Sequence, residues 1–173
     1  MAVAVGIDVA KDFHWAVITV AESGKVLLSR RVDNTPSDIG ALVGQIAEAQ
    51  AAHGPATVGI DVLGGIAALL EAMLLQADLT VVHVPGIAVN RARRATVGGE
   101  RKSDPKDARV IADQVRMRGD LRPVQPDREL DIELRLLVGR RGDLVTDATR
   151  RAARLRDLLT SIHPGLERIV DVT

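Results

Sequence analysis

Cysteine is absent from the 173 residues, and the aromatic residues are limited to Phe13 and Trp15. The lack of cysteine excludes disulfide bonds, thiolate zinc sites and cysteine nucleophiles. The four histidines are too scattered along the sequence to suggest a ligand pair, so we expect oxygen ligands for any metal ion. Because aromatic rings are so few, a nucleic-acid surface built on base stacking is not expected.

Long apolar runs are also missing. No stretch approaches the roughly 18 to 20 apolar residues that a membrane helix needs, and the N-terminus lacks a basic run followed by an apolar segment. We therefore expect a cytoplasmic protein without membrane contact. Hydrophobic residues still make up 46% of the chain, which is enough for a buried core.

The net charge is zero, but the two parts of the chain differ in sign. Residues 1–80 hold four basic and nine acidic side chains, and subtraction from the 23 of each leaves 19 basic and 14 acidic side chains in residues 81–173. The excess is concentrated in residues 90–103, interpreted as a cationic loop that suits a polyanion. The candidate nucleic-acid-binding residues are Arg91, Arg93, Arg94, Arg101 and Lys102, together with Lys106 just beyond the loop.

Hydrophobic patterning predicts an α/β domain. Short apolar runs rich in β-formers predict strands, and Thr35-Pro36 predicts a helix start with Thr35 as the cap. The order of elements indicates a mixed five-stranded sheet with flanking helices. Strands are predicted at 3–9, 13–20, 25–32, 56–62 and 79–84, and helices at 35–52, 65–77 and 103–118.

The segment after residue 122 carries a heptad pattern. Pro123 and Pro126 mark a linker, and the apolar steps of four and three beyond it are typical of a coiled coil. We expect domains 1–122 and 123–173, the second a long helix or helical hairpin with a break or close helix contact near Gly139 and Gly142. The seam consists of Leu130, Leu134, Leu137, Leu144, Ala148, Leu155, Leu158 and Ile162, with Arg141 and Arg151 at the remaining core positions.

The pentapeptide VGIDV occurs at residues 5–9 and again at 58–62, so two separate strands each deliver an aspartate. If these strands are parallel neighbours, Asp8 and Asp61 lie side by side. Close carboxylates repel one another unless a divalent cation such as Mg²⁺ or Mn²⁺ shares them. Asp104 and Asp107 lie on one face of a helix start and complete four carboxylates, which could seat two metal ions for phosphodiester cleavage.

Each of these carboxylates also has a simpler interpretation. Asp104 suits a helix N-cap and Asp107 suits the first turn, and for this pair alone capping is the more common role. Asp8 and Asp61 could each begin a turn. Their joint occurrence in the same local pattern favours a metal site. The rival acids Asp12, Asp33 and Asp113 are interpreted as belonging to turns and solvated faces.

GIDVAKDFHWAV at residues 6–17 and KSDPKDARVIA at 102–112 resemble the N-terminal part of DEDD transposases of the insertion-sequence 110 family. The resemblance covers residues 3–122, and the helical segment behind them resembles the coiled-coil region of that family. It implies a ribonuclease H-like (RuvC-like) fold, in which the four candidate carboxylates coordinate Mg²⁺ for DNA cleavage and transfer during transposition. It also implies an element-encoded guide RNA.

The sequence departs from the family pattern in two places. The second acid of the family is usually a glutamate before a small residue, threonine and glycine, whereas Asp61 precedes Val62-Leu63-Gly64-Gly65. Its carboxylate reaches one methylene less far. The family also has a C-terminal domain with a nucleophilic serine, which nothing after Thr173 supplies. We therefore expect a truncated chain that binds nucleic acid and metal but does not complete recombination alone.

Two other functions fit parts of the sequence. A non-catalytic remnant would bind nucleic acid or a full-length transposase through its helical seam, which also predicts homo-oligomers. A fragment of an actin-like sugar kinase shares the plan of the sheet. The residues after Asp8, Val-Ala-Lys-Asp, lack the glycine and threonine of such a phosphate loop, so this function ranks last.

Overall fold

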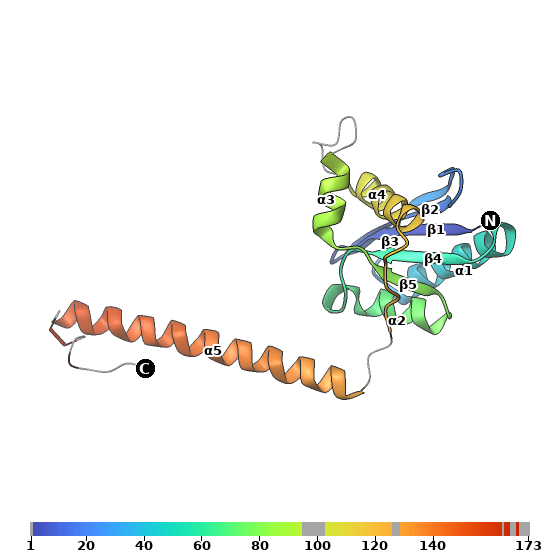
Figure 1. The fold of residues 1–173 in the computed structure, drawn as a ribbon. Coiled ribbons are helices and arrows are strands. Elements are labelled where there is room, and N and C mark those ends of the chain that lie inside the picture. The colour runs from blue at the N-terminus through green and yellow to red at the C-terminus, as the bar shows by residue number, and fades with distance from the viewer. Residues whose placement is uncertain (1, 95–102, 126–128, 164, 167–168, 170–173) are drawn as a thin grey trace. The chain divides into compact units, whose positions relative to one another are not determined.

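The computed structural model describes residues 2–94, 103–125, 129–163, 165–166 and 169 (Figure 1). The chain divides into two compact units, Met1–Gln125 and Pro126–Thr173. Within the described residues, no helix combines the length and the apolar character that a membrane span requires.

The first unit is built on a mixed five-stranded sheet with the strand order β3-β2-β1-β4-β5. The three N-terminal strands form an antiparallel meander, while β4 pairs parallel with both β1 and β5. The predicted parallel pairing of the first and fourth strands is therefore confirmed. The strands are β1 (Val3–Asp8), β2 (Phe13–Val20), β3 (Val26–Asp33), β4 (Ala56–Ile60) and β5 (Thr80–His83).

Helices cover both faces of this sheet, α1 and α2 on one face and α4 on the other, while α3 packs against α4 (Figure 1). The larger core lies under α1 and α2, where Ile39, Leu42 and Leu70 are fully buried against β1 and β4. A smaller core joins α3 and α4. The elements are α1 (Pro36–His53), the 3₁₀ turn η1 (Gly65–Ala67), α2 (Ala68–Gln76), α3 (Gly86–Arg94) and α4 (Asp104–Met117).

The glycines of the repeated VGIDV motif let α4 lie directly on the sheet. A β-carbon at Gly6 would come within 2.2 Å of the backbone oxygen of Ala108 and the backbone nitrogen of Ala112. Gly59, the register partner of Gly6, also faces this side, because a β-carbon there would meet Val115 at 2.4 Å. The sequence thus fixes where α4 packs.

The start of α1 is fixed by a predicted cap. Thr35 is the N-cap, Pro36 follows it at the first helical position, and Thr35 Oγ1 accepts a hydrogen bond from the Asp38 backbone N–H at 3.3 Å. The Asp38 carboxylate in turn accepts from the Asp33 N–H at 2.7 Å and pairs with Arg30. These contacts join the end of β3 to α1.

Replacing Thr35 with alanine is expected to lower the free energy of unfolding by about 1 kcal/mol, because one helical N–H loses its acceptor. Chemical denaturation measures the change. Thr35→Ser keeps the hydroxyl and should remain close to the parent protein. An equal loss in both variants would contradict the capping role of this hydroxyl.

The interpretation of residues 90–103 as a loop is wrong at its beginning. Residues 86–94 form α3, whose first turn donates from the N–H groups of Ala88 and Val89 to the Pro85 oxygen. Val89 is buried against α4, so tertiary packing stabilises a helix in a segment whose charge is its most visible feature. The rest of the loop, residues 95–102, lies outside the described residues.

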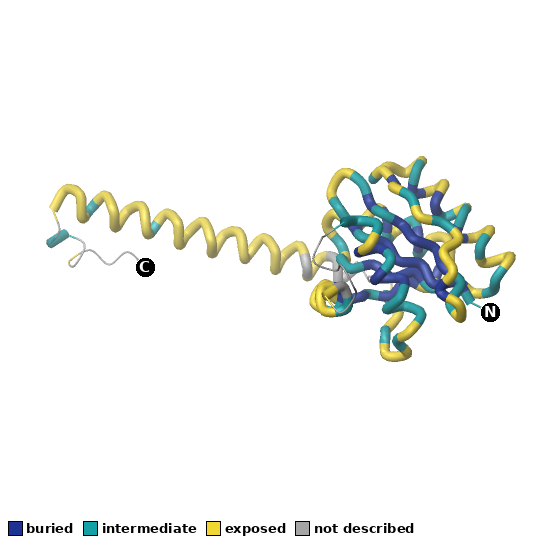
Figure 2. Tube along the Cα trace, turned by 90° about the horizontal axis from the view of Figure 1, so that it is seen from above, coloured by how far each residue is buried: buried dark blue, intermediate teal, exposed yellow. Residues whose placement is uncertain are grey.

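The described residues of the second unit form α5 (Glu129–Ile162), a helix of 34 residues. The break expected near Gly139 and Gly142 is wrong, because α5 runs through both glycines without interruption. A β-carbon at either glycine would meet nothing within 4 Å in this chain, so the alternative of a close helix contact stays a prediction for contacts with a second helix. A glycine in an exposed helix costs only about 1 kcal/mol, too little to interrupt this length. The apolar side chains of Leu137 and Leu158 are about 60% exposed. Figure 2 shows the described part of α5 in the exposed colour along most of its length. The coiled coil stays a prediction.

Candidate active site

Asp8 and Asp61 lie at the same edge of the sheet. Asp8 ends β1, and Asp61 directly follows β4, whose Ile60 is in register with Ile7. The backbone N–H of Val9 donates to Asp61 Oδ1 at 3.1 Å, which ties the two strand ends together. Because residues two apart share a face of a strand, Asp8 points to the same side of the sheet as Gly6, the side that α4 covers.

The first turn of α4 carries the other two acids. Asp104 is the first helical residue and is half-buried, whereas Asp107 is only 4% exposed. The interpretation of Asp104 as the N-cap is wrong: Ser103 holds that position, with its backbone oxygen accepting from the N–H groups of Lys106 and Asp107. Pro105 fits the first helical turn, and the helix begins at Asp104, one residue after the predicted start at 103. Capping therefore does not account for the Asp104 carboxylate.

The electrostatics of Asp61 connect it to α4. Burial raises the pKa of the Asp61 carboxyl, and the negative charge of Asp107 raises it further. The hydrogen bond from Val9 and the nearby His83 act in the opposite direction and are outweighed. Asp61 and Asp107 are thus close enough for like charges to interact across the sheet and α4.

The raised pKa predicts how stability depends on pH. Because the pKa of Asp61 is higher in the folded state than in the unfolded state, ionisation of this group favours unfolding, and its stabilising contribution is lost as pH rises through the folded-state value. In a chelating buffer, Asp61→Asn should be more stable than the parent at pH 7, since the amide oxygen can still accept from Val9. Thermal unfolding measures the difference in stability between the two proteins. This difference should shrink or vanish below pH 3.8, the ordinary pKa of an aspartate. A constant difference across this range would contradict the assignment.

Two histidines that the sequence analysis set aside also lie beside Asp61. His83, at the end of β5, approaches the backbone oxygen of Asp61 with its Nε2 at 3.2 Å. His14 is fully buried, and its Nδ1 accepts from the N–H of Ala10 at 3.4 Å. Burial lowers the pKa of His14, while the Asn34 side chain and the charge of Asp61 partly oppose that shift. The sequence offered one indication of this, because His83 lies near the end of a predicted strand, as Asp8 and Asp61 do.

Asn34 holds together the loops that follow the two aspartates. Its side-chain amide donates to the backbone oxygen of Lys11 at 3.0 Å and to that of Ile66 at 3.4 Å. Asn34 Oδ1 and His14 Nε2 are both buried, and neither atom has a hydrogen-bond partner among the described residues. The loop after β1 and the loop after β4 are therefore linked through one side chain, which supports the spacing of Asp8 and Asp61.

The rival acids have other roles. Asp12 and Asp33 are exposed, and Asp33 accepts from Arg31 at 2.9 Å. The sequence predicted that Asp113 lies on a solvated face, and this is wrong. Its carboxylate pairs with Arg109 at 3.2 Å and with Arg116 at 2.7 Å. These ion pairs belong to α4, and Arg109 also donates to the Gly24 oxygen at the β2–β3 turn.

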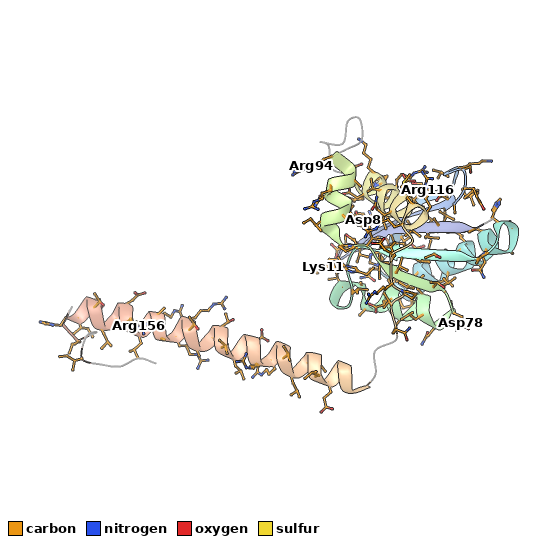
Figure 3. The ribbon with its side chains drawn as sticks, in the orientation of Figure 1. Asp8, Lys11, Asp78, Arg94, Arg116 and Arg156 are labelled. Atoms are coloured by element: carbon orange, nitrogen blue, oxygen red, sulfur yellow. The ribbon has the colours of Figure 1, made fainter. Side chains whose placement is uncertain are left out.

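The basic residues near the acids are partly described. Arg91 and Arg94 are exposed on α3, which packs on α4, and Lys106 is exposed in the first turn of α4. Figure 3 shows Asp8 and Lys11 at one end of the sheet, with Arg94 at the far end of α3. The side chain of Arg93 and all of Arg101 and Lys102 lie outside the described residues.

No group of three or more histidine, aspartate and glutamate side chains is arranged to hold a metal ion in the part of the chain that the structure describes. The donor chemistry nevertheless suits a hard divalent cation, since Asp8, Asp61 and Asp107 offer only carboxylate oxygens. The like-charge interaction of Asp61 with Asp107 is the kind of repulsion that such a cation relieves.

The sheet order and the flanking helices define a ribonuclease H-like α/β fold. Two structures of Thermus thermophilus RuvC share it, each with a TM-score of 0.50. One, in complex with a Holliday junction substrate, is 17% identical and covers 72% of this chain and 100% of its own. The other is 16% identical and covers 70% of this chain and 99% of its own.

The chain belongs to the DEDD transposase family of IS110, whose family model, described as a transposase, matches residues 5–164. It is 44% identical to the 44.8 kDa protein of insertion element IS116 from Streptomyces clavuligerus over 96% of its length. It is 37% identical to the 42 kDa protein of IS900 from Mycobacterium paratuberculosis, also over 96%. The chain spans 40% and 41% of these two relatives, about two fifths of their length.

Proposed function

We propose that residues 1–122 form the catalytic domain of a DNA transposase, which cleaves and transfers DNA strands by metal-dependent phosphodiester chemistry. Two observations carry the proposal: β1 and β4 end side by side with Asp8 and Asp61, and the charges of Asp61 and Asp107 interact. Membership in the transposase family and the RuvC-like fold support it. Residues 123–173 would form a separate helical segment, consistent with the division of the chain after Gln125.

The metal in this proposal is Mg²⁺ or Mn²⁺. Asp8, Asp61, Asp104 and Asp107 would hold it, and such an ion lowers the pKa of a bound water and stabilises the leaving oxygen in phosphodiester cleavage. The chain itself supplies the arrangement of ligands. Val9 and Asn34 fix the strand ends, and the close packing of α4 over Gly6 brings Asp107 to them.

Nucleic acid would approach along α3 and the start of α4. Arg91, Arg94 and Lys106 are exposed there and can pair with phosphates, which supply most of the affinity of proteins for DNA. Arg93, Arg101 and Lys102 extend the same cationic segment in sequence. The partners would be DNA and an element-encoded guide RNA.

A DNA-cleavage assay tests this function. The chain is incubated with labelled branched DNA in Mn²⁺, and nicks are resolved on a denaturing gel. Nicking that requires the metal and is lost in Asp8→Asn would support the proposal. Metal-independent nicking, or equal nicking by Asp8→Asn and the parent, would contradict it.

The exposed apolar side of α5 supports a second part of the proposal, self-association of the chain. Leu134, Leu137 and Leu144 follow steps of three and seven and are each more than half exposed, and a monomer leaves this seam in water. A second copy of the same helix offers a matching seam.

Introducing a charge into the seam with Leu137→Asp is expected to convert an oligomer into a monomer, because a carboxylate would be buried between two helices. Analytical ultracentrifugation measures the mass. Thr146→Asp is the control, since it places the same residue at an exposed position on the outer side of α5, away from the seam, and should not change the mass. A monomeric parent, or an oligomeric Leu137→Asp variant, would contradict association through α5.

A further inference from the structure

Both aromatic residues of the chain lie on β2, next to the candidate active site. Trp15 is the register partner of Asp8 on one side and of Arg31 on the other. Residues opposite one another in antiparallel strands point to the same face of the sheet. Trp15 is therefore the lateral neighbour of Asp8, on the face that carries α4.

This part of the sheet face forms a defined surface. We call Phe13, Trp15, Ser29 and Arg31 the ring surface. The indole Nε1–H of Trp15 donates to Ser29 Oγ at 3.0 Å, which fixes the plane of the ring. The guanidinium of Arg31 lies 4.0 Å from the centroid of Phe13, while its side chain stays 56% exposed. The result is an oriented ring beside a carboxylate, with a partly exposed guanidinium next to it that also pairs with Asp33 at 2.9 Å.

The burial of β2 separates this surface from the core. His14 and Ala16, which alternate with the two aromatic residues, are fully buried on the opposite face. Phe13 and Trp15 are only half-buried, and Ser29 and Arg31 are exposed on the neighbouring edge strand β3. Their partial exposure leaves some of the aromatic surface beside Asp8 accessible to a ligand.

We propose that the ring surface binds an unpaired nucleotide of the DNA strand whose phosphate is cleaved. Trp15 stacks on the base or packs on its sugar, and Arg31 pairs with an adjacent phosphate. Stacking on an aromatic ring tolerates any base, which suits a site that must hold a strand next to the acids. This inference rests on the proposed function, since it places the scissile phosphate at Asp8. It also departs from the expectation, based on the small number of aromatic residues, that base stacking plays no part in nucleic-acid binding.

The composition of the chain makes Trp15 its own reporter. It is the single tryptophan, and tyrosine is absent, so the intrinsic fluorescence of the full chain comes from this ring. Titration with a branched DNA that has unpaired arms should quench the emission and saturate at the same concentration as the anisotropy of a dye on that DNA. Binding by anisotropy without any change in emission would overturn the inference and leave the proposed function standing. If the parent binds neither branched nor single-stranded DNA, the proposed function fails and the inference fails with it.

Variants test the contacts separately. Trp15→Leu should weaken DNA binding about tenfold, within the range that loss of one stacked base produces, whereas Trp15→Phe should stay close to the parent. Arg31→Gln should weaken binding and lower its salt dependence. Arg30→Gln is the matched control, because Arg30 lies on the opposite face of the same strand, where it pairs with Asp38. Thermal unfolding shows whether each variant is folded. Unchanged affinity in a folded Trp15→Leu variant would overturn the inference.

Discussion

Replacement of Asp8 and Asp107 together by asparagine is expected to abolish the binding of Mn²⁺ to the chain. Loss of one supporting group outside a metal's ligands already weakens binding 10- to 100-fold, so loss of two ligands should exceed about 100-fold. The structural reason is that Asp8 and Asp107 come from opposite sides of the site, one from β1 and the other from α4. Isothermal titration calorimetry on the parent and the double variant measures the effect.

The control for this experiment is Asp12→Asn. Asp12 is an exposed acid four residues beyond Asp8, so the variant loses a charge near the site and leaves the proposed ligands intact. It should bind Mn²⁺ as the parent does. Equal binding by the parent and the Asp8/Asp107 variant would show that the acids do not form a metal site.

A single methyl group at Gly6 is expected to lower the free energy of unfolding by about 3 kcal/mol or more. The added β-carbon would lie 2.2 Å from backbone atoms of Ala108 and Ala112, which cannot rotate away as a side chain could. The helix α4 would have to move off the sheet, taking Asp107 with it. Chemical denaturation of Gly6→Ala measures the loss, and calorimetry should show that Mn²⁺ binding falls with it.

Gly44→Ala is the control for Gly6→Ala and is expected to stabilise the fold. Gly44 is exposed in the interior of α1, and a β-carbon there would meet nothing within 4 Å. Alanine should therefore stabilise the chain by about 1 kcal/mol through helix propensity. If Gly6→Ala were as stable as Gly44→Ala, α4 would not depend on the close approach at Gly6.

The sheet could be predicted from the sequence because its strands differ in pattern from the elements between them. Short apolar runs predicted β1, β2, β4 and β5, the turn residues before Lys25 predicted β3, and Thr35-Pro36 marked the start of α1. The helix α3 was missed, since its charged residues dominate the local pattern and its stability depends on Val89 packing against α4. Packing between distant segments is not contained in a local window of sequence.

The edge that carries Asp8 and Asp61 could be predicted because a repeated pentapeptide on parallel neighbours fixes the relative position of its members. The contribution of the histidines could not. His14 and His83 are 69 positions apart (83 minus 14) in the sequence. They lie near Asp61 only because the strand order places β2 and β5 on either side of β1 and β4. The same holds for Asn34, whose role depends on two loops that the sheet brings together.

The central claim is that Asp8, Asp61 and Asp107 share a divalent cation. The most direct test is a crystal structure of the chain grown with Mn²⁺, with anomalous diffraction data to locate the metal. An anomalous peak is expected between the ends of β1 and β4 and the first turn of α4, within about 2.0 to 2.6 Å of carboxylate oxygens from these residues. Well-ordered carboxylates with no peak among them at saturating Mn²⁺ would contradict it.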